Sequence, residues 1–383
     1  METIGIICEY NPLHLGHKKQ LDAVRAAYPN GGIVCLMSGN YVQRGAPAIV
    51  DKTLRAKAAI LSGADLVLEL PITASLSSAE GFAREGVRIL GCFCNRLCFG
   101  TESADADTLL ATAKALQSPA FSETLRTELD KGLSFPAARQ AALKIMGLDA
   151  DILTRPNDIL ATEYCKAILE FGVSMTPMVI HRAGSYHDTA IDLENPSATA
   201  LREQMVSGGD WLSLVPEAAR TVLADAPIHT LAAGEQAILY RLRTMTDAEF
   251  EALPYGSEGL WRKLMTNARK YATLEEIITA TKSKRYTRTR LDRMVMCAFL
   301  GITAEDIASP PPYARVLAFN DTGRLLLKSA RQSGLFPNAG EQVDSPYQAL
   351  EHRVGMLYSQ FSADKQEPPC REDDRRVYYR KGD

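Results

Sequence analysis

The sequence predicts an α/β fold, with a doubly wound parallel sheet and a helical insertion, followed by a mainly helical C-terminal domain. Short apolar runs rich in β-branched residues alternate with amphipathic helical patterns through the first hundred residues. Continuous apolar strands that alternate with helices are typical of βαβ units whose parallel sheet is covered on both faces. Beyond about residue 228, long helical patterns with few strand-like runs replace this alternation. At 383 residues, the chain has room for more than one domain.

Five segments are predicted to be strands, and the helical patterns lie between them. The strand candidates are residues 3–8, 32–38, 64–70, 96–100 and 177–184. Leu21, Val24 and Tyr28 share one face of a helix after the first strand, as expected for a helix packed on a sheet. A further helix is expected to begin after Ser197, a residue type that is favoured at the N-cap position.

The remaining residues divide into an insertion, a helical domain and a tail. Residues 105–150 are predicted to be helices inserted before the sheet resumes. We expect residues 1–225 to form the catalytic domain and residues 226–383 to form a mainly helical RNA-binding domain with a mixed C-terminal part. The last residues, 364–383, are polar and rich in charge, which is typical of poorly ordered termini.

The composition of the chain limits the classes of function that it can have. Apolar residues make up 46% of the chain and charged residues 23%, and the formal net charge is −3. Binding to a polyanion must therefore come from a local patch of cations. No basic segment followed by an apolar run and a cleavage site begins the chain, and no run approaches the length of a membrane span. We expect a cytoplasmic protein with no membrane association.

Three of the eight cysteines, Cys92, Cys94 and Cys98, are close together in the sequence. Their spacing lacks the paired CxxC arrangement of structural zinc sites, and no fourth ligand is evident. Buried thiols that pack as small apolar side chains are the other interpretation. We predict no metal site from them.

The motif with the clearest chemistry follows the first predicted strand. His14 and His17, with Gly16 between them, come after Tyr10, Asn11 and Pro12 at the start of a helix. In open α/β sheets this is the carboxyl edge, where ligands bind. The first N–H groups of a helix favour an anion, and imidazole N–H groups there can stabilise negative charge on a phosphate. A metal site with Glu9 and a chance pairing of histidines are the other interpretations; Walker A and GxGxxG motifs are absent.

This stretch resembles the HxGH signature of the nucleotidyltransferase superfamily, whose members bind ATP at that helix start and attack its α-phosphorus. The second signature of the superfamily, Ser-x-Thr-x-(Ile/Leu)-Arg, is matched by "SATALR". There, Ser197, Thr199 and Arg202 stand at a predicted helix start that suits binding of the β- and γ-phosphates. Alone, this second match would be an ordinary N-cap.

Longer stretches are similar to the tRNA(Met) cytidine acetate ligase family. They are "SGNYVQRGAPAIVDKTLRAKAAILSGADLVLELP" at 38–71, "FGTES" at 99–103, "RPNDILATEYCKAI" at 155–168 and "SKRYTRTRLDRM" at 283–294. The resemblance implies that acetate is activated as acetyl-adenylate. It also implies that the acetyl group passes to N4 of the wobble cytidine, position 34, of elongator tRNA(Met), giving N4-acetylcytidine. It extends over residues 1 to about 330 and is weaker in the tail.

By this resemblance, the catalytic residues are His14 and His17, and Mg²⁺ is expected with ATP, bound largely through phosphates and water. The implied ATP contacts are Ile7, Cys8, Glu9, Tyr10, Asn11, Pro12, Leu13, His14, Leu15, Gly16, His17, Lys18, Lys19, Gln20, Gly100, Asn157, Arg182, Ser197, Thr199 and Arg202. No acidic pair in the sequence indicates a metal cage.

Two further groups of residues are candidates for binding the acid and the RNA. Gln43 and Arg44 follow the second predicted strand and are candidates for binding acetate, although Arg44 equally suits a surface salt bridge. A concentrated basic segment, 282–293, suits contacts to a phosphate backbone; a solvated helix face is its other interpretation. The RNA-binding candidates are Lys282, Lys284, Arg285, Tyr286, Arg288, Arg290 and Arg293.

Two rival functions remain open from the sequence. A small-molecule adenylyltransferase of the same superfamily would share both signatures, but it leaves the basic helical domain unexplained. A non-catalytic RNA-binding protein would not need both histidines and Arg202. The sequence indicates neither the oligomeric state nor how acetate is selected over larger acids.

Overall fold

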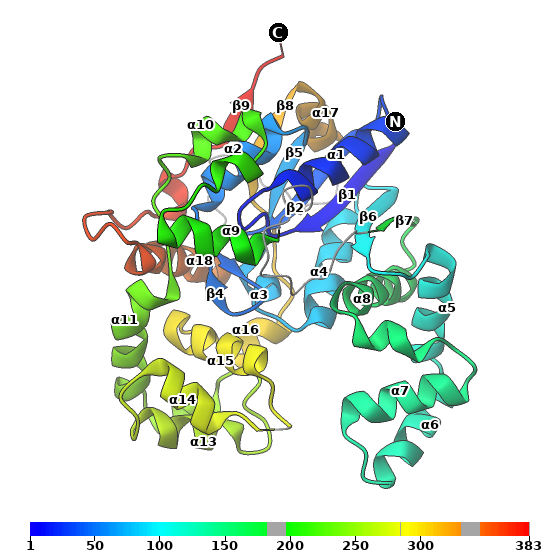
Figure 1. Ribbon diagram of the computed structural model, residues 1–383, viewed down its shortest axis with the longest axis vertical. Coiled ribbons are helices and arrows are strands. Elements are labelled where there is room, and N and C mark those ends of the chain that lie inside the picture. The colour runs from blue at the N-terminus through cyan, green and yellow to red at the C-terminus, as the bar shows by residue number, and fades with distance from the viewer. Residues whose placement is uncertain (182–196, 284, 331–344, 383) are drawn as a thin grey trace.

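The computed structural model describes residues 1–181, 197–283, 285–330 and 345–382. Within these ranges, seven strands form one sheet in the order β7-β6-β1-β2-β5-β8-β9 (Figure 1). The strands are β1 (Thr3–Cys8), β2 (Gly32–Ser38), β5 (Leu66–Leu70), β6 (Arg96–Thr101), β7 (Thr176–His181), β8 (Val316–Asn320) and β9 (Tyr378–Arg380). All neighbouring pairs are parallel except β5 and β8. The predicted α/β fold with a mostly parallel sheet is confirmed.

Helices cover both faces of the sheet because its central strands are apolar on both sides. On one face, Ile33, Cys35 and Met37 of β2 pack with residues of α1 and α2. On the other face, Val34 and Leu36 pack with residues of α4, α8 and α17, as the alternation of side chains along a strand requires. The helices are α1 (Leu15–Ala27), α2 (Lys52–Leu61), α4 (Ala79–Leu90), α8 (Pro156–Phe171) and α17 (Asp321–Ala330).

The predicted insertion consists of three helices, which extend away from the sheet in Figure 1. They are α5 (Ala106–Leu116), α6 (Pro119–Asp130) and α7 (Phe135–Ile145), followed by a 3₁₀ turn, Ala150–Thr154. Phe121, Ala142 and Leu143 form a small core of their own between α6 and α7.

Residues 231–308 form the helical region, whose core is separate from the cores on the sheet. Its helices are α11 (Leu231–Thr244), α12 (Asp247–Glu251), α13 (Leu260–Ala268), α14 (Leu274–Thr281), α15 (Arg288–Leu300) and α16 (Ala304–Ala308). Tyr41, Ile72 and Leu76 from the first half of the chain belong to the same core. Tyr41 begins a small hairpin, β3 (Tyr41–Val42) and β4 (Ala46–Pro47), and Ile72 begins α3 (Ile72–Ser75).

Other elements join the sheet to the helical region. Leu201 and Met205 of α9 and Leu223 of α10 pack on Ala58 of α2. Leu350 and Val354 of α18 belong to the core of the helical region. The elements are α9 (Ala198–Ser207), α10 (Glu217–Leu223), α18 (Pro346–Leu357), and the 3₁₀ turns Leu212–Leu214, Tyr358–Phe361 and Glu372–Asp374.

The C-terminal part differs from the sequence-based expectation. β8 and β9 extend the main sheet beside β5, and Glu372 is buried. The expectation of a poorly ordered tail is therefore wrong for the described residues up to 382, because strand pairing and a buried carboxylate hold them. The boundary at residue 225 stays a prediction, with residues 316–320 and 378–380 lying in the sheet of the first domain. In the part of the chain that the structure describes, no helix combines the length and apolar composition that crossing a bilayer requires.

Candidate active site

The strand order changes direction beside β1, and this positions the site. β2 and β5 follow on one side of β1, whereas β6 and β7 lie on its other side. The loops after β1 and β6 leave the sheet in opposite directions at such a point, which leaves a crevice at the carboxyl edge. The HxGH residues follow β1 directly, so they lie at this edge.

The two histidines form the N-terminal cap of α1. Nδ1 of His14, the N-cap residue, accepts a hydrogen bond from the N–H of Gly16 at 3.1 Å. Nδ1 of His17 accepts one from the N–H of His14 at 3.3 Å. The rings are stacked with their centroids 3.7 Å apart. Because both Nδ1 atoms accept, each neutral ring carries its proton on Nε2 and can donate it.

Several contacts fix the conformation of the loop that leads to His14. Tyr10 has a φ of +44°, the Asn11–Pro12 peptide bond is cis, and the ring of Tyr10 lies 4.9 Å from that of His17. Oδ1 of Asn11 accepts a hydrogen bond from the N–H of Ile49 at 2.7 Å. The loop is therefore fixed by its own aromatic packing and by the chain that follows the hairpin.

The two sequence signatures meet in space. Ser197 caps α9 by accepting from the N–H of Ala200 at 3.1 Å, as the sequence predicted. Nη1 of Arg202 donates to the main-chain oxygen of Asn11 at 2.8 Å, and its Nη2 donates to Oγ1 of Thr199 at 3.1 Å. Arg202 therefore joins the start of α9 to the HxGH loop, although 191 residues separate it from Asn11.

Gly100 and Asn157 lie on neighbouring elements. Gly100 is in β6, and Asn157 is in the first turn of α8. Glu102, which the sequence did not single out, accepts hydrogen bonds from the N–H of Asn157 at 3.1 Å and from its side-chain Nδ2 at 2.7 Å. Glu102 thus caps α8 and fixes Asn157; an acid just after a strand carries no periodic signal by which it could be found. Arg182 lies outside the described residues.

The other predicted ATP contacts are placed around α1. Leu13 is buried, and burial raises the pKa of the Cys8 thiol. Lys18 pairs with Asp22 at the surface, and Nε2 of Gln20 lies 3.6 Å from Sγ of Cys98. Leu15, Gly16 and Lys19 lie in the first turns of α1. All of these residues stay predictions as ATP contacts.

The acid-binding candidates, Gln43 and Arg44, lie at the tip of the β3–β4 hairpin. The N–H of Gln43 donates to Oε1 of Glu9 in the HxGH loop at 2.9 Å. Arg44 is exposed. The structure therefore brings Gln43 next to the predicted nucleotide site.

The basic segment begins after α14 and continues into α15, and most of its described cations have protein partners. Arg285 pairs with Glu258, which also accepts from the hydroxyl of Tyr286, and Arg288 pairs with Glu275 and Asp292. These pairs are exposed or half-buried, so phosphates can compete for them. Lys282 is exposed, and Lys284 lies outside the described residues.

Arg290 and Arg293 make contacts within the protein. Arg290 donates to the main-chain oxygen of Tyr255 at 2.7 Å. Arg293 is only 8% exposed and donates to the main-chain oxygen of Gln43. A guanidinium buried between protein elements is poorly placed to reach a phosphate backbone, and the RNA contact of Arg293 stays a prediction.

Arg55 is a second important residue that sequence reasoning missed. It is fully buried in α2, and its guanidinium donates to four main-chain oxygens: those of Glu9, Ser38, Gly39 and Val50. These oxygens come from the ends of β1 and β2 and from the segment before α2. Arg55 thus holds together the carboxyl edge of the sheet. A single arginine in an amphipathic helix gives no signal of this in the sequence.

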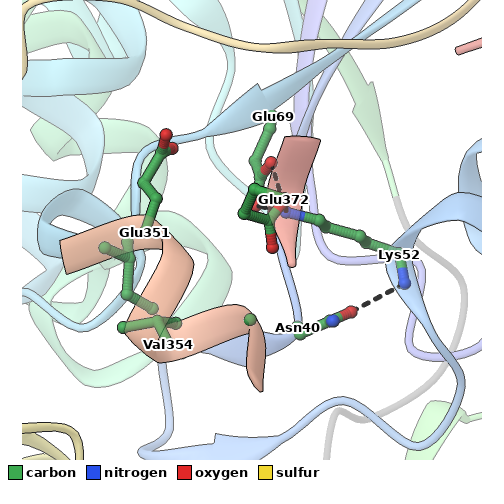
Figure 2. Close-up of a pocket in the computed structure, with 8 residues that line it drawn as sticks. Asn40, Lys52, Glu69, Glu351, Val354 and Glu372 are labelled. Atoms are coloured by element: carbon green, nitrogen blue, oxygen red, sulfur yellow. Dashed lines mark hydrogen bonds and ion pairs between the residues drawn. The ribbon is translucent and has the colours of Figure 1, made fainter. Parts of the chain in front are cut away.

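A cluster of buried charges lies beside this edge and lines a small pocket (Figure 2). Nζ of Lys52 lies 2.7 Å from Glu69 and 2.5 Å from Glu372. Burial and the neighbouring carboxylates of Glu372 and Glu351 raise the pKa of Glu69 to about 7. Lys52, Glu69 and Glu372 in its wall already pair with one another, so we assign the pocket a structural role.

No metal centre emerges from the described residues. Among them, no group of three or more His, Cys, Asp or Glu side chains is arranged to hold a metal ion. Cys92 is exposed, whereas Cys94 and Cys98 are buried, and burial raises the pKa of both buried thiols.

Comparison with known proteins shows extensive similarity. The model of the HIGH nucleotidyl transferase family matches residues 1–372. A tRNA(Met) cytidine acetate ligase of Clostridium novyi (strain NT) is 37% identical over 357 residues, which cover 88% of this chain and 89% of that protein. The tRNA(Met) cytidine acetate ligase of Clostridium acetobutylicum is 34% identical, with 100% of this chain and 99% of that protein covered.

Two solved structures are similar over their whole length. Thermotoga maritima TmcAL in its apo form I superposes with a TM-score of 0.90 at 28% identity, with both chains fully covered. The same protein bound with alpha-thio ATP, form II, gives a TM-score of 0.87 at 28% identity and the same coverage. The two structures thus share the fold of this chain over its whole length, and the two relatives match most or all of its sequence.

Proposed function

The chain belongs to the tRNA(Met) cytidine acetate ligase family of HIGH nucleotidyl transferases, and from this premise we propose how its residues carry out the reaction. It is an ATP-dependent, tRNA-modifying ligase. We propose that it forms acetyl-adenylate from acetate and ATP. The acetyl group then passes to N4 of cytidine 34 of elongator tRNA(Met).

One observation carries this mechanism: Arg202 joins the start of α9 to the HxGH loop at the carboxyl edge of the sheet. Two helix starts therefore lie beside one loop, and both favour phosphate oxygens. Nε2–H groups of His14 and His17 would donate to the α-phosphate as negative charge develops there. Ser197, Thr199 and Arg202 would hold the β- and γ-phosphates.

In the first step, an acetate oxygen attacks the α-phosphorus and pyrophosphate leaves. The contribution of the protein is to position the two anions and to stabilise charge on the phosphorus centre. In the second step, N4 of the cytidine attacks the acetyl carbon, the C–O bond to the adenylate breaks, AMP leaves, and the nitrogen loses a proton. Neither histidine needs to act as a base in the first step, because acetate is already ionised at neutral pH.

The remaining parts of the proposal concern ions, acid and RNA. We expect Mg²⁺ to accompany ATP; binding largely through phosphates and water would require few protein ligands. Gln43 and Arg44 are proposed for the acetate side of the site because Gln43 contacts the HxGH loop. Lys282, Arg285, Tyr286 and Arg288 are proposed for contacts to tRNA. We expect the enzyme to act in the cytoplasm, where ATP and tRNA are available.

The experiment that tests the proposal measures pyrophosphate release from ATP in three mixtures: no acid, acetate alone, and acetate with tRNA(Met). Acetate-dependent release and exchange of labelled pyrophosphate into ATP support adenylate formation. Label from acetate recovered in the tRNA supports transfer. If no small acid stimulates exchange or release, with or without tRNA, the ligase mechanism is wrong. If a phosphorylated metabolite stimulates it instead, the adenylyltransferase alternative is correct.

A further inference from the structure

The β3–β4 hairpin lies between the HxGH loop and the helical region. It follows β2 at the carboxyl edge of the sheet and is closed by a hydrogen bond from the N–H of Gly45 to the oxygen of Val42 at 2.9 Å. Gly45 has a φ of +79°, which a glycine adopts without strain. The hairpin is therefore a short and well-defined element.

On one side, the hairpin holds the HxGH loop through Glu9. The N–H of Gln43 donates to the carboxylate of Glu9 at 2.9 Å, and its side-chain Nε2 lies 3.4 Å from the main-chain oxygen of Ser77. The main-chain oxygen of Glu9 accepts from Nη1 of Arg55 at 2.5 Å. Glu9 is the second residue before Asn11 and stands at the start of the loop that ends at His14. A displacement of the hairpin would therefore move the start of this loop.

On the other side, the hairpin rests on α15. Nη1 of Arg293 lies 3.4 Å from the main-chain oxygen of Gln43, and its guanidinium lies over the ring of Tyr255, 5.3 Å from the centroid. A Cβ added at Gly45 would overlap main-chain atoms of Asp292 and Arg293. Gly45 is thus packed against the backbone of α15 with no space for a side chain.

The base of the hairpin is fixed in the core of the helical region. Tyr41 is fully buried, and its hydroxyl donates to the main-chain oxygen of Val354 at 3.3 Å. Its ring meets those of Tyr358 and Phe361 edge-on, with centroids 5.9 and 6.0 Å away. The base of the hairpin is therefore held by residues 354–361, which belong to the same core as the helical region, and its tip is held by α15.

Burial of the Arg293 guanidinium is energetically unfavourable for a purely structural contact. It is 92% buried from solvent, and among the described residues no carboxylate lies within ion-pair distance of it and its Nε has no hydrogen-bond partner. A buried cation without an ion pair is unfavourable. It contacts the aromatic face of Tyr255 and the main-chain oxygen of Gln43.

We propose that Arg293 and Gly45 are positioning residues for adenylate formation. They hold the hairpin against α15 so that Gln43 holds Glu9 and the HxGH loop. The inference rests on the proposed function, since it takes that loop to be the ATP site. It assigns Arg293 to the first chemical step and not to RNA binding, although Arg293 lies at the end of the basic segment.

The test compares variants in acetate-dependent exchange of pyrophosphate into ATP, measured without tRNA, with tRNA binding measured separately. Arg293→Met should lower kcat/KM for exchange by roughly tenfold or more, since small displacements of reacting groups have effects of up to ~10²-fold. Arg293→Lys, which keeps a donor for the oxygen of Gln43, should recover most of the loss. Gly45→Ala should reproduce the loss independently, and tRNA binding by Arg293→Met should stay within about twofold of the wild type.

Arg353→Met is the matched control. Arg353 also donates to main-chain oxygens in the helical region, those of Leu300 and Gly301 at 2.9 and 3.0 Å, but it does not contact the hairpin. Thermal melts followed by circular dichroism identify the folded variants. Exchange at the wild-type level in folded Arg293→Met or Gly45→Ala, or an equal loss in Arg353→Met, would overturn the inference alone. A wild-type chain without acetate-dependent exchange would overturn the proposed function and this inference with it.

Discussion

Replacing His14 by asparagine separates its role as a helix cap from its chemical role. Oδ1 of asparagine occupies the position of Nδ1 of histidine, so it can accept the hydrogen bond that Gly16 donates at 3.1 Å. Asparagine is also among the best N-cap residues. The substitution removes Nε2, the atom that we expect to donate to the α-phosphate.

Each effect has an expected magnitude. Loss of the stacked contact with His17 should cost about 0.5–1 kcal/mol of stability, as for other aromatic pairs. His14→Ala loses the cap as well, which adds about 1 kcal/mol. Loss of one donor to the developing charge should reduce the rate of adenylate formation by about 10²–10³-fold, or about 2.7–4 kcal/mol in the transition state.

The assay pairs exchange of pyrophosphate into ATP with unfolding in urea, for His14→Asn, His14→Ala and His17→Asn. We expect both asparagine variants to be nearly as stable as the wild type and much slower. His14 is buried and His17 is half-buried. Comparing the rates of His14→Asn and His17→Asn shows which ring contributes more to adenylate formation. If His14→Asn retains the wild-type rate while His14→Ala is destabilised, His14 is only a helix cap and the reasoning is wrong.

Three further predictions follow from the contacts around the site. Arg202→Met should raise the KM for ATP at least tenfold. The substitution removes the guanidinium and with it a hydrogen bond to Asn11, of a kind that contributes about 1.5–3 kcal/mol. An unchanged KM in the exchange assay would contradict this. Lys282→Glu combined with Arg285→Glu should raise the KM for tRNA and flatten its dependence on salt, and a loss of exchange without tRNA would instead indicate a role near ATP. The raised pKa of Glu69, about 7, means that the folded protein keeps a proton which the unfolded chain releases near pH 4.5. This contribution to stability is therefore complete below about pH 4.5 and is lost as the pH rises through 7. Glu69→Gln should flatten the slope of the melting temperature between pH 5 and 8, and an unchanged slope would show that Glu69 does not hold the proton.

The central strands and the two helix starts that carry the signatures could be predicted because each has a local cause. Residues 33–37 are apolar without interruption, and the structure buries all of β2 between two layers of helices. His14 and Ser197 each stand where a helical pattern begins, and both are N-caps in the structure. What brings them together could be expected only from the resemblance, because 191 residues separate Arg202 from Asn11.

Features that depend on distant contacts could not be predicted. β8 pairs antiparallel with β5 after a long helical segment, and no local pattern distinguishes such a strand from a buried loop. The sequence predicts that Arg293 is exposed like its basic neighbours, because a run of cations usually indicates a solvated face. Its burial depends on Gln43, 250 residues earlier in the chain, and the capping of α8 by Glu102 depends on a similar long-range contact.

The helical region and the tail are as much part of the candidate site as the sheet is. Tyr41 extends from the carboxyl edge of the sheet into the core of the helical region. Glu372 reaches Lys52 in the first turn of α2, the helix whose Arg55 holds the ends of β1 and β2. Removing Glu372 would leave fewer carboxylates for a buried ammonium, and breaking such a pair usually costs about 3–5 kcal/mol. The loop that carries His14 is therefore positioned by residues from the beginning, the middle and the end of the chain, so the site depends on the fold of the whole chain.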